Sequence, residues 1–221
     1  MVQQADVTGQ IARHFVFGNE LFFVQIGSND GRSGDPVYDV VRHDPRWRGI
    51  LVEPVPSVFR RLKSNYENDS RFIFENVAIT DDDGFRSFYS VSETAKQSLP
   101  ELPAWLDHLS SFDKELILKF DPRLEPHIQE LQVRCKRLSQ LLEGNSVGRI
   151  DLLHIDAEGH DWAILRQLDL SKHLPSIILF EQCHLSEEDR SAAIALLGGK
   201  FRIKLIGRDC LCVRKSCLDF L

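Results

Sequence analysis

Short apolar runs alternate with amphipathic stretches along most of the chain. The apolar runs predict strands at Leu21–Ile26, Gly49–Glu53, Phe72–Ile79, Ile150–Ile155 and Ile177–Glu181. These runs are apolar nearly throughout, as strands covered on both faces should be. The stretches between them predict helices at Val58–Tyr66, Arg137–Leu142, Asp161–Leu168 and Ser186–Leu197, the last with Ser186 as its N-cap. This order predicts a mostly parallel sheet with helices on both faces.

The remaining segments are less regular. The turn sequence Asp81-Asp82-Asp83-Gly84, followed by the alternating run Phe85–Val91, predicts a hairpin between Phe72–Ile79 and Phe85–Val91. Prolines interrupt residues 92–126, which we expect to form an irregular insertion, either a lid or a cover over the sheet edge, with short helices at Trp105–Leu109 and Asp113–Phe120. Further strands are expected at Gln129–Lys136, Phe201–Ile206 and Cys210–Val213, and a helical extension at residues 1–20.

Composition narrows the class of protein. The chain has 221 residues, 43% of them hydrophobic, which favours one domain spanning residues 1–221. A formal net charge of -6 gives no electrostatic footprint for nucleic acid, and no apolar run is long enough for a membrane span or a signal peptide. Five cysteines without a Cys-x-x-Cys pair suggest neither a disulfide framework nor a zinc ribbon, and we expect a reducing, cytoplasmic location. The oligomeric state stays open, a homodimer included.

The predicted strand ends carry the candidate chemistry. In open parallel sheets, ligands bind outside the carboxyl ends of the strands. Four such ends carry polar or glycine residues: Gly27–Gly31, Glu53, Asp156-Ala157-Glu158, and Glu181 with His184 shortly after it. Glycines let a backbone approach a ligand closely, and a carboxylate after the second strand can accept both hydroxyl hydrogens of a ribose. We therefore expect these residues to converge on one crevice.

The glycine loop indicates which nucleotide-like ligand fits. Its spacing, Gly27-x-x-x-Gly31-x-x-Gly34, lacks the close first pair of the dinucleotide fingerprint. Asp30 would also repel a pyrophosphate. A ligand with a ribose and a positively charged amino-acid end, without phosphates, suits this loop better, and S-adenosylmethionine has these properties.

Five segments, in order, carry a family resemblance: QIGSNDG, GILVEPVPSVFRRL, ENVAI, RLSQLL and DLLHIDAEGHDWAIL. They resemble the FkbM family of S-adenosylmethionine-dependent methyltransferases over about residues 20–215. The resemblance implies an α/β fold, a Rossmann-like three-layer αβα sandwich with a mostly parallel seven-stranded sheet and an antiparallel C-terminal strand. It also implies O-methylation of a hydroxyl group on a small molecule such as a sugar, a glycan or another natural product.

The same resemblance implies roles for individual residues. Gly27, Ser28 and Asn29 would line the methionine part of the cofactor, Glu53 would bind the ribose, and Asp156 would face the reactive methyl group. The implied cofactor-binding set is Gly27, Ser28, Asn29, Asp30, Glu53, Pro54, Asn76, Val77, Ala78 and Asp156. Many family members have a more apolar loop sequence where this chain has Asn29-Asp30-Gly31. This difference leaves open which residues contact the methionine part of the cofactor.

Methyl transfer to an alcohol requires removal of the hydroxyl proton, which leaves two mechanisms open. In the first, Asp156 or His184 is the general base and Glu181 orients or shares the site. In the second, a divalent metal such as Mg²⁺ lowers the hydroxyl pKa, with Asp156 and Glu181 as candidate ligands. Two other functions also stay open at this stage: a cofactor-binding assembly protein without catalysis, and a nicotinamide-dependent reductase.

Overall fold

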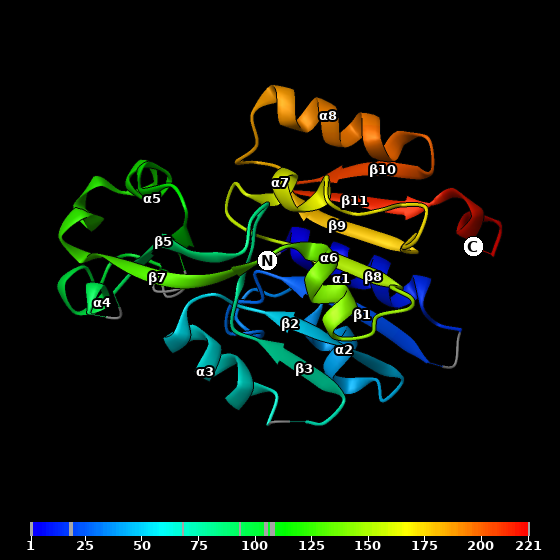
Figure 1. Cartoon of the computed structure of the whole chain (residues 1–221), viewed down its shortest axis with the longest axis horizontal. Helices are drawn as coiled ribbons and strands as arrows, with labels where there is room; N and C mark the ends of the chain where they lie inside the picture. The colour runs from blue at the N-terminus through cyan, green and yellow to red at the C-terminus, as the bar shows by residue number, and fades with distance from the viewer. Residues whose placement is uncertain are drawn as a thin grey trace.

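A seven-stranded sheet forms the body of the protein in this computed structural model, which describes residues 2–17, 20–67, 69–92, 94–103, 106 and 109–220 (Figure 1). Its strand order is β10-β11-β9-β8-β1-β2-β3. The strands are β1 (Leu21–Ile26), β2 (Trp47–Val52), β3 (Phe72–Glu75), β8 (Leu152–Ile155), β9 (Ile177–Glu181), β10 (Phe201–Ile206) and β11 (Asp209–Arg214). Within this sheet β11 runs in the direction opposite to the other six strands. The predicted fold class, including the antiparallel C-terminal strand, is confirmed.

Helices cover both faces of this main sheet (Figure 1). One face packs against α1 (Val2–His14), α2 (Tyr38–His43) and the end of α3 (Pro56–Asn65), and the other against α6 (Leu138–Gly144), α7 (Asp161–Leu165) and α8 (Glu187–Gly198). Successive residues of a strand point to opposite faces, so Phe23 of β1 joins the first core and Val24 joins the second. Burial on both sides explains why the strands read as apolar runs.

Register brings three strand ends to one level. β1 lies between β2 and β8, and its last residue, Ile26, is paired with Val52 on one side and Ile155 on the other. The next residues along each strand are therefore neighbours in space: Gly27, Glu53 and Asp156. The parallel pairing thus locates the predicted crevice at the carboxyl ends of β1, β2 and β8.

A second, four-stranded sheet extends from the carboxyl ends of the main sheet (Figure 1). Its order is β4-β7-β5-β6, with β4 (Ala78–Ile79), β5 (Gly84–Val91), β6 (Ser110–Ser111) and β7 (Ile128–Lys136). The predicted hairpin is wrong, because β5 pairs along its whole length with β7 and not with the strand before it. The expected strand Phe72–Ile79 is also split, with β3 in the main sheet and β4 in the second one.

The 92–126 segment contains more regular structure than we expected. It includes α4 (Ala95–Ser98), β6, α5 (Lys114–Phe120) and the 3-10 helix η2 (Pro122–His127). Leu106, Ile117 and Leu124 form its small core. Trp105 lies outside the described residues. The 3-10 helix η3 (Lys215–Phe220) follows β11, and none of the described helices is long and apolar enough to cross a membrane.

Candidate functional site

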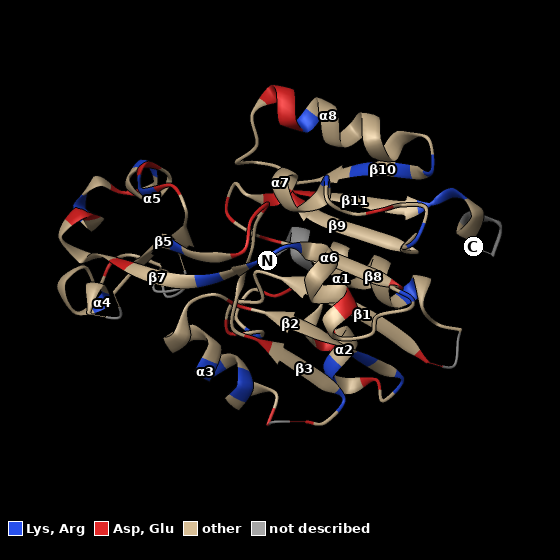
Figure 2. Ribbon diagram, viewed as in Figure 1, with Lys and Arg blue, Asp and Glu red and all other residues tan. Residues whose placement is uncertain are grey.

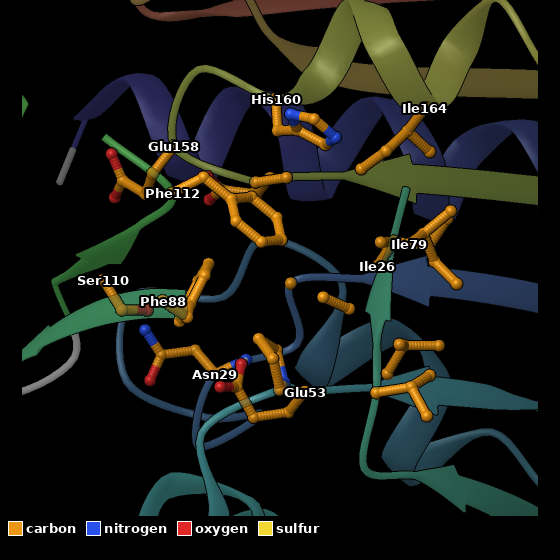
Figure 3. A pocket seen from close by; sticks show the side chains of 17 residues that line it. Ile26, Asn29, Glu53, Ile79, Phe88, Ser110, Phe112, Glu158, His160 and Ile164 are labelled. Atoms are coloured by element: carbon orange, nitrogen blue, oxygen red, sulfur yellow. The ribbon is translucent and has the colours of Figure 1, made fainter. Parts of the chain in front are cut away.

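A cavity of about 590 Å³, open to solvent, lies between the carboxyl ends of the main sheet and the second sheet (Figure 3). Its polar wall comes from Asn29, Glu53, Ser110, Asp156, Glu158 and His160. Its apolar wall comes from Ile26, Val52, Val77, Ala78, Ile79, Phe88, Phe112 and Ile164. Gly27, Pro54 and Ala157 complete the lining. A mostly apolar cleft of this size with a few convergent polar groups is typical of a small-molecule site.

The backbone of Gly27 is packed directly against that of Asp156. A Cβ on Gly27 would lie 1.7 Å from the Asp156 carbonyl oxygen, and the residue has φ +76°. The amides of Gly27 and Ser28 both donate to the Val52 carbonyl, at 3.0 and 2.9 Å. The loop therefore requires glycine here for a steric and a conformational reason.

Ser28 and Asp30, both predicted cofactor ligands, are placed in the body of the loop and do not line the cavity. The buried Ser28 hydroxyl donates to the Gln25 carbonyl at 3.1 Å and accepts from the Val52 amide at 3.0 Å. Asp30 Oδ1 accepts from the amides of Arg32 and Ser33, at 2.9 and 2.7 Å. These side chains shape the turn that presents Gly27 and Asn29.

Glu53 is buried beside the loop, with 4% of its surface exposed. Its Oε2 accepts from the Asn29 amide at 3.0 Å and its Oε1 from the Val55 amide at 2.8 Å. Burial raises its pKa to about 7 in spite of these two bonds. Asn76 does not line the cavity, because its amide donates to the carbonyls of Glu53 and Pro54, at 2.7 and 3.0 Å. Asn76 thus fixes the turn that carries Glu53.

Carboxylates gather where β8 and β9 end, and Figure 2 shows acidic residues along the strand ends that face the second sheet. Burial, reinforced by the charges of Glu181 and Glu158, raises the pKa of Asp156 well above its usual value. Burial also raises the pKa of Asp161, whose Oδ1 and Oδ2 accept from the amides of Glu181 and Ala157. Asp161 therefore holds the two strand ends together, while Asp156 faces the cavity.

His184 and Glu181 lie next to the cavity and not in its lining. His184 Nε2 is 3.2 Å from Glu158 Oε2 and 3.7 Å from Glu181 Oε2. The adjacent Glu158 carboxylate is the main reason that the pKa of His184 is raised. Arg208, in the turn between β10 and β11, donates from Nε to Glu181 Oε1 at 2.8 Å, and its Nη2 is 2.9 Å from His184 Nε2. The structure thus places two further residues, Glu158 and Arg208, in contact with Glu181 and His184.

Aromatic side chains close the cavity from the side of the second sheet (Figure 3). Phe112 meets Phe88 edge-on at 4.7 Å and the His160 ring at 5.0 Å, and the Arg86 guanidinium lies 4.9 Å from the Phe112 ring centre. His160 Nε2 is buried and has no hydrogen-bond partner among the described residues. A ring nitrogen in that position is available to a ligand.

Comparison with known proteins identifies the family. The methyltransferase FkbM domain matches residues 25–202, which is most of the chain. The chain belongs to the FkbM methyltransferase family. Membership supports S-adenosylmethionine as its methyl donor, and it favours methyl transfer over a nicotinamide-dependent reduction.

Solved methyltransferase structures share only a distant likeness with this FkbM methyltransferase. The N-methyltransferase NodS from Bradyrhizobium japonicum WM9 is 10% identical, with a TM-score of 0.46 and coverage of 96% of this chain and 95% of that one. A precorrin-6y C5,15-methyltransferase from Geobacter metallireducens GS-15 is also 10% identical, with a TM-score of 0.44 and coverage of 94% and 87%. Comparison with curated proteins finds no match to the chain. Sequence identities and TM-scores this low do not allow the substrate of either protein to be assigned to this chain.

Cofactor affinity of this FkbM methyltransferase should depend on pH through Glu53. A carboxylate can accept both ribose hydroxyl hydrogens, whereas the protonated acid cannot. With a pKa of about 7, the ionised fraction of Glu53 falls roughly tenfold between pH 8 and pH 6. We expect the Kd of S-adenosylhomocysteine, measured by calorimetry, to rise by up to about tenfold over this interval.

The Glu53→Gln variant is the control for this prediction. It should bind S-adenosylhomocysteine more weakly at pH 8 and lose the pH dependence. A wild-type Kd that stays constant from pH 8 to pH 6 would contradict the assignment of Glu53 to the ribose.

Proposed function

We propose that this FkbM methyltransferase transfers the methyl group of S-adenosylmethionine to a hydroxyl group of a small molecule, with Asp156 as the general base. One observation carries the proposal. A carboxyl group whose pKa is raised by burial lines the cavity at the end of β8, beside the glycine loop. A base is most effective when its pKa lies near the working pH, and burial moves a carboxylate in that direction.

The surroundings favour Asp156 over His184 as the base. Asp156 lines the cavity, whereas His184 lies beside it with Nε2 already engaged by Glu158 and Arg208. A nitrogen between a carboxylate and a guanidinium has no free position for the proton of an acceptor. In the proposed mechanism Arg208 balances the charge of Glu181, and His184 is a polar neighbour of Glu158.

The proposed arrangement of the cofactor follows the cavity wall. The methionine part would lie at Gly27 and Asn29, the ribose at Glu53, and the adenine against Val77 and Ala78. The acidic residues around Asp156 would attract the sulfonium and ammonium charges of the cofactor. Positioning of the methyl group against the acceptor oxygen would supply much of the rate.

Two measurements test the proposal. Calorimetry should detect binding of S-adenosylhomocysteine and none of NADH. Incubation with S-adenosylmethionine carrying a labelled methyl group and a panel of neutral sugars, polyols, phenols and amines should then give an O-methylated product, identified by mass spectrometry and NMR. An N-methylated product would contradict the reaction class. Cofactor binding without turnover on any acceptor would favour an assembly protein without catalysis.

We expect the reaction to be independent of a divalent metal. The carboxylate oxygens of Asp156, Glu158 and Glu181 lie within 4.8 Å of one another, which is compatible with a cation. However, Glu181 Oε1 already accepts from Arg208, and Glu158 Oε2 lies 3.2 Å from His184 Nε2, so a metal would have to displace two protein side chains. Turnover should therefore change less than about twofold in excess EDTA. A loss of turnover that added Mg²⁺ restores would establish the metal mechanism instead.

We also propose a reducing compartment, such as the cytoplasm, as the place of action. All five cysteines are unpaired, although the sulfur atoms of Cys210 and Cys212 are only 3.8 Å apart. The same proposal requires that the methyl acceptor is a small molecule present in that compartment.

A further inference from the structure

The loop between β8 and α7 contains two residues with left-handed backbone. Glu158 has φ +45° and Gly159 has φ +92°. Glycine adopts this region freely, but a glutamate rarely does. A non-glycine residue in this region persists only where its surroundings hold it, and such residues cluster at functional sites.

The second sheet holds this loop. The hydroxyl of Ser111, on β6, donates to the Glu158 carbonyl at 3.0 Å. Ser111 is 3% exposed, so this hydrogen bond is shielded from water. One residue further on, a Cβ on Gly159 would lie 3.1 Å from Leu116 of α5 and 3.6 Å from the Cβ of His184. The loop is therefore enclosed between the second sheet and the segment after β9.

This conformation places the Glu158 carboxylate in the cavity lining next to that of Asp156. Glu158 Oε2 is 3.2 Å from His184 Nε2, and it makes no other contact within hydrogen-bonding distance among the described residues. Figure 3 shows Glu158 and Ser110 at the end of the cavity away from Ile79. An acceptor beside Asp156 would lie against Glu158 as well.

We propose that Glu158 contacts the methyl acceptor and that Ser111 is the residue that positions it. This inference rests on the proposed function, because it gives Glu158 the task of orienting the hydroxyl group whose proton Asp156 takes. Ser111 touches neither acceptor nor cofactor in this scheme. It acts through the Glu158 carbonyl, so that the second sheet sets the geometry of the site and does more than cover it.

The test uses the binary complex with S-adenosylmethionine that carries a ¹³C-labelled methyl group, and it needs no acceptor. A residue that orients the reacting hydroxyl group lies close to the methyl group that this hydroxyl receives, so its carboxylate affects the methyl resonance. We expect Glu158→Gln and Ser111→Ala to shift this resonance in the same direction. The double variant should resemble Glu158→Gln alone, because effects of residues that act through one contact are not additive.

Two further variants separate positioning from general stability. Ser111→Thr keeps the hydroxyl group and should restore the wild-type resonance. Ser87→Ala removes a hydroxyl group elsewhere in the second sheet, where it accepts from Gln132 at 2.9 Å, and it should leave the resonance unchanged.

The outcomes are distinct. If Glu158→Gln leaves the methyl resonance unchanged, the proposed role of Glu158 is overturned. If Ser111→Ala leaves the methyl resonance unchanged, the role of Ser111 is overturned. The same holds if the shift in the double variant equals the sum of the two single shifts. Failure of the labelled cofactor to bind the wild-type protein would instead contradict the proposed function.

Discussion

The Asp156→Asn variant should lose turnover by about 10²–10⁴-fold while it still binds S-adenosylhomocysteine. Asparagine has the shape of aspartate but cannot accept the acceptor proton. The substitution also removes a buried charge that lies near Glu181, Glu158, Asp161 and Asp209. Relief of that repulsion should leave the free energy of unfolding unchanged or higher, so the loss of activity should occur without a loss of stability.

Asp209→Asn is the matched control for this variant. Asp209 belongs to the same field of carboxylates, and burial raises its pKa to about 6, but it does not line the cavity. We expect its turnover to change by less than about tenfold. If Asp156→Asn retained full turnover and His184→Ala lost it, the base would be His184 and the proposed roles would be reversed. Single-turnover rates at saturating cofactor make this comparison independent of product release.

The residues that the main sheet contributes could be predicted from the sequence. Parallel strands buried on both faces have a strong local pattern, and β1 was predicted with its observed bounds, Leu21–Ile26. Once the strand ends are known, the parallel register determines which residues meet. Gly27, Glu53 and Asp156 therefore converge as expected, each directly after a residue paired with its neighbour strand.

The contributions of the second sheet could not be predicted in the same way. The turn sequence before Gly84 indicated a local hairpin, whereas β5 pairs with β7, on the far side of the insertion. Long-range antiparallel pairing leaves no local mark beyond the alternation of Phe85–Val91, so the place of Phe88 in the cavity could not be inferred. Phe112 and Ser111 lie on or next to β6, a strand too short to show any pattern.

The roles of the short polar side chains in the glycine loop are less predictable from the sequence than those of its glycines. The family resemblance implies that Ser28 and Asp30 contact the cofactor. In the structure they hydrogen-bond to backbone groups of β1, β2 and the loop itself. Serine and aspartate readily bind nearby backbone groups, so adjacency to a ligand-binding glycine does not separate a contact residue from one that shapes the turn. Arg208 illustrates the opposite case, a turn residue far along the chain that reaches the site.

The Gly27→Ala variant should weaken binding of S-adenosylhomocysteine by about 100-fold or more, since a methyl group there would lie 1.7 Å from the Asp156 carbonyl oxygen. Neither side can yield cheaply, because the obstacle is backbone and the Gly27 amide is bonded to Val52. Left-handed strain and overpacking together should lower the free energy of unfolding by about 2–6 kcal/mol, measured by urea denaturation.

Gly84→Ala separates the two causes of that loss. Gly84 also has a positive φ, +119°, but an added Cβ would meet no atom within 4 Å. This variant should lose only the conformational part, about 1–3 kcal/mol of stability, and bind S-adenosylhomocysteine as the wild type does. Equal Kd values for Gly27→Ala and Gly84→Ala would mean that the cofactor does not depend on the close approach of the Gly27 and Asp156 backbones, and the ligand would then have to be placed elsewhere in the cavity.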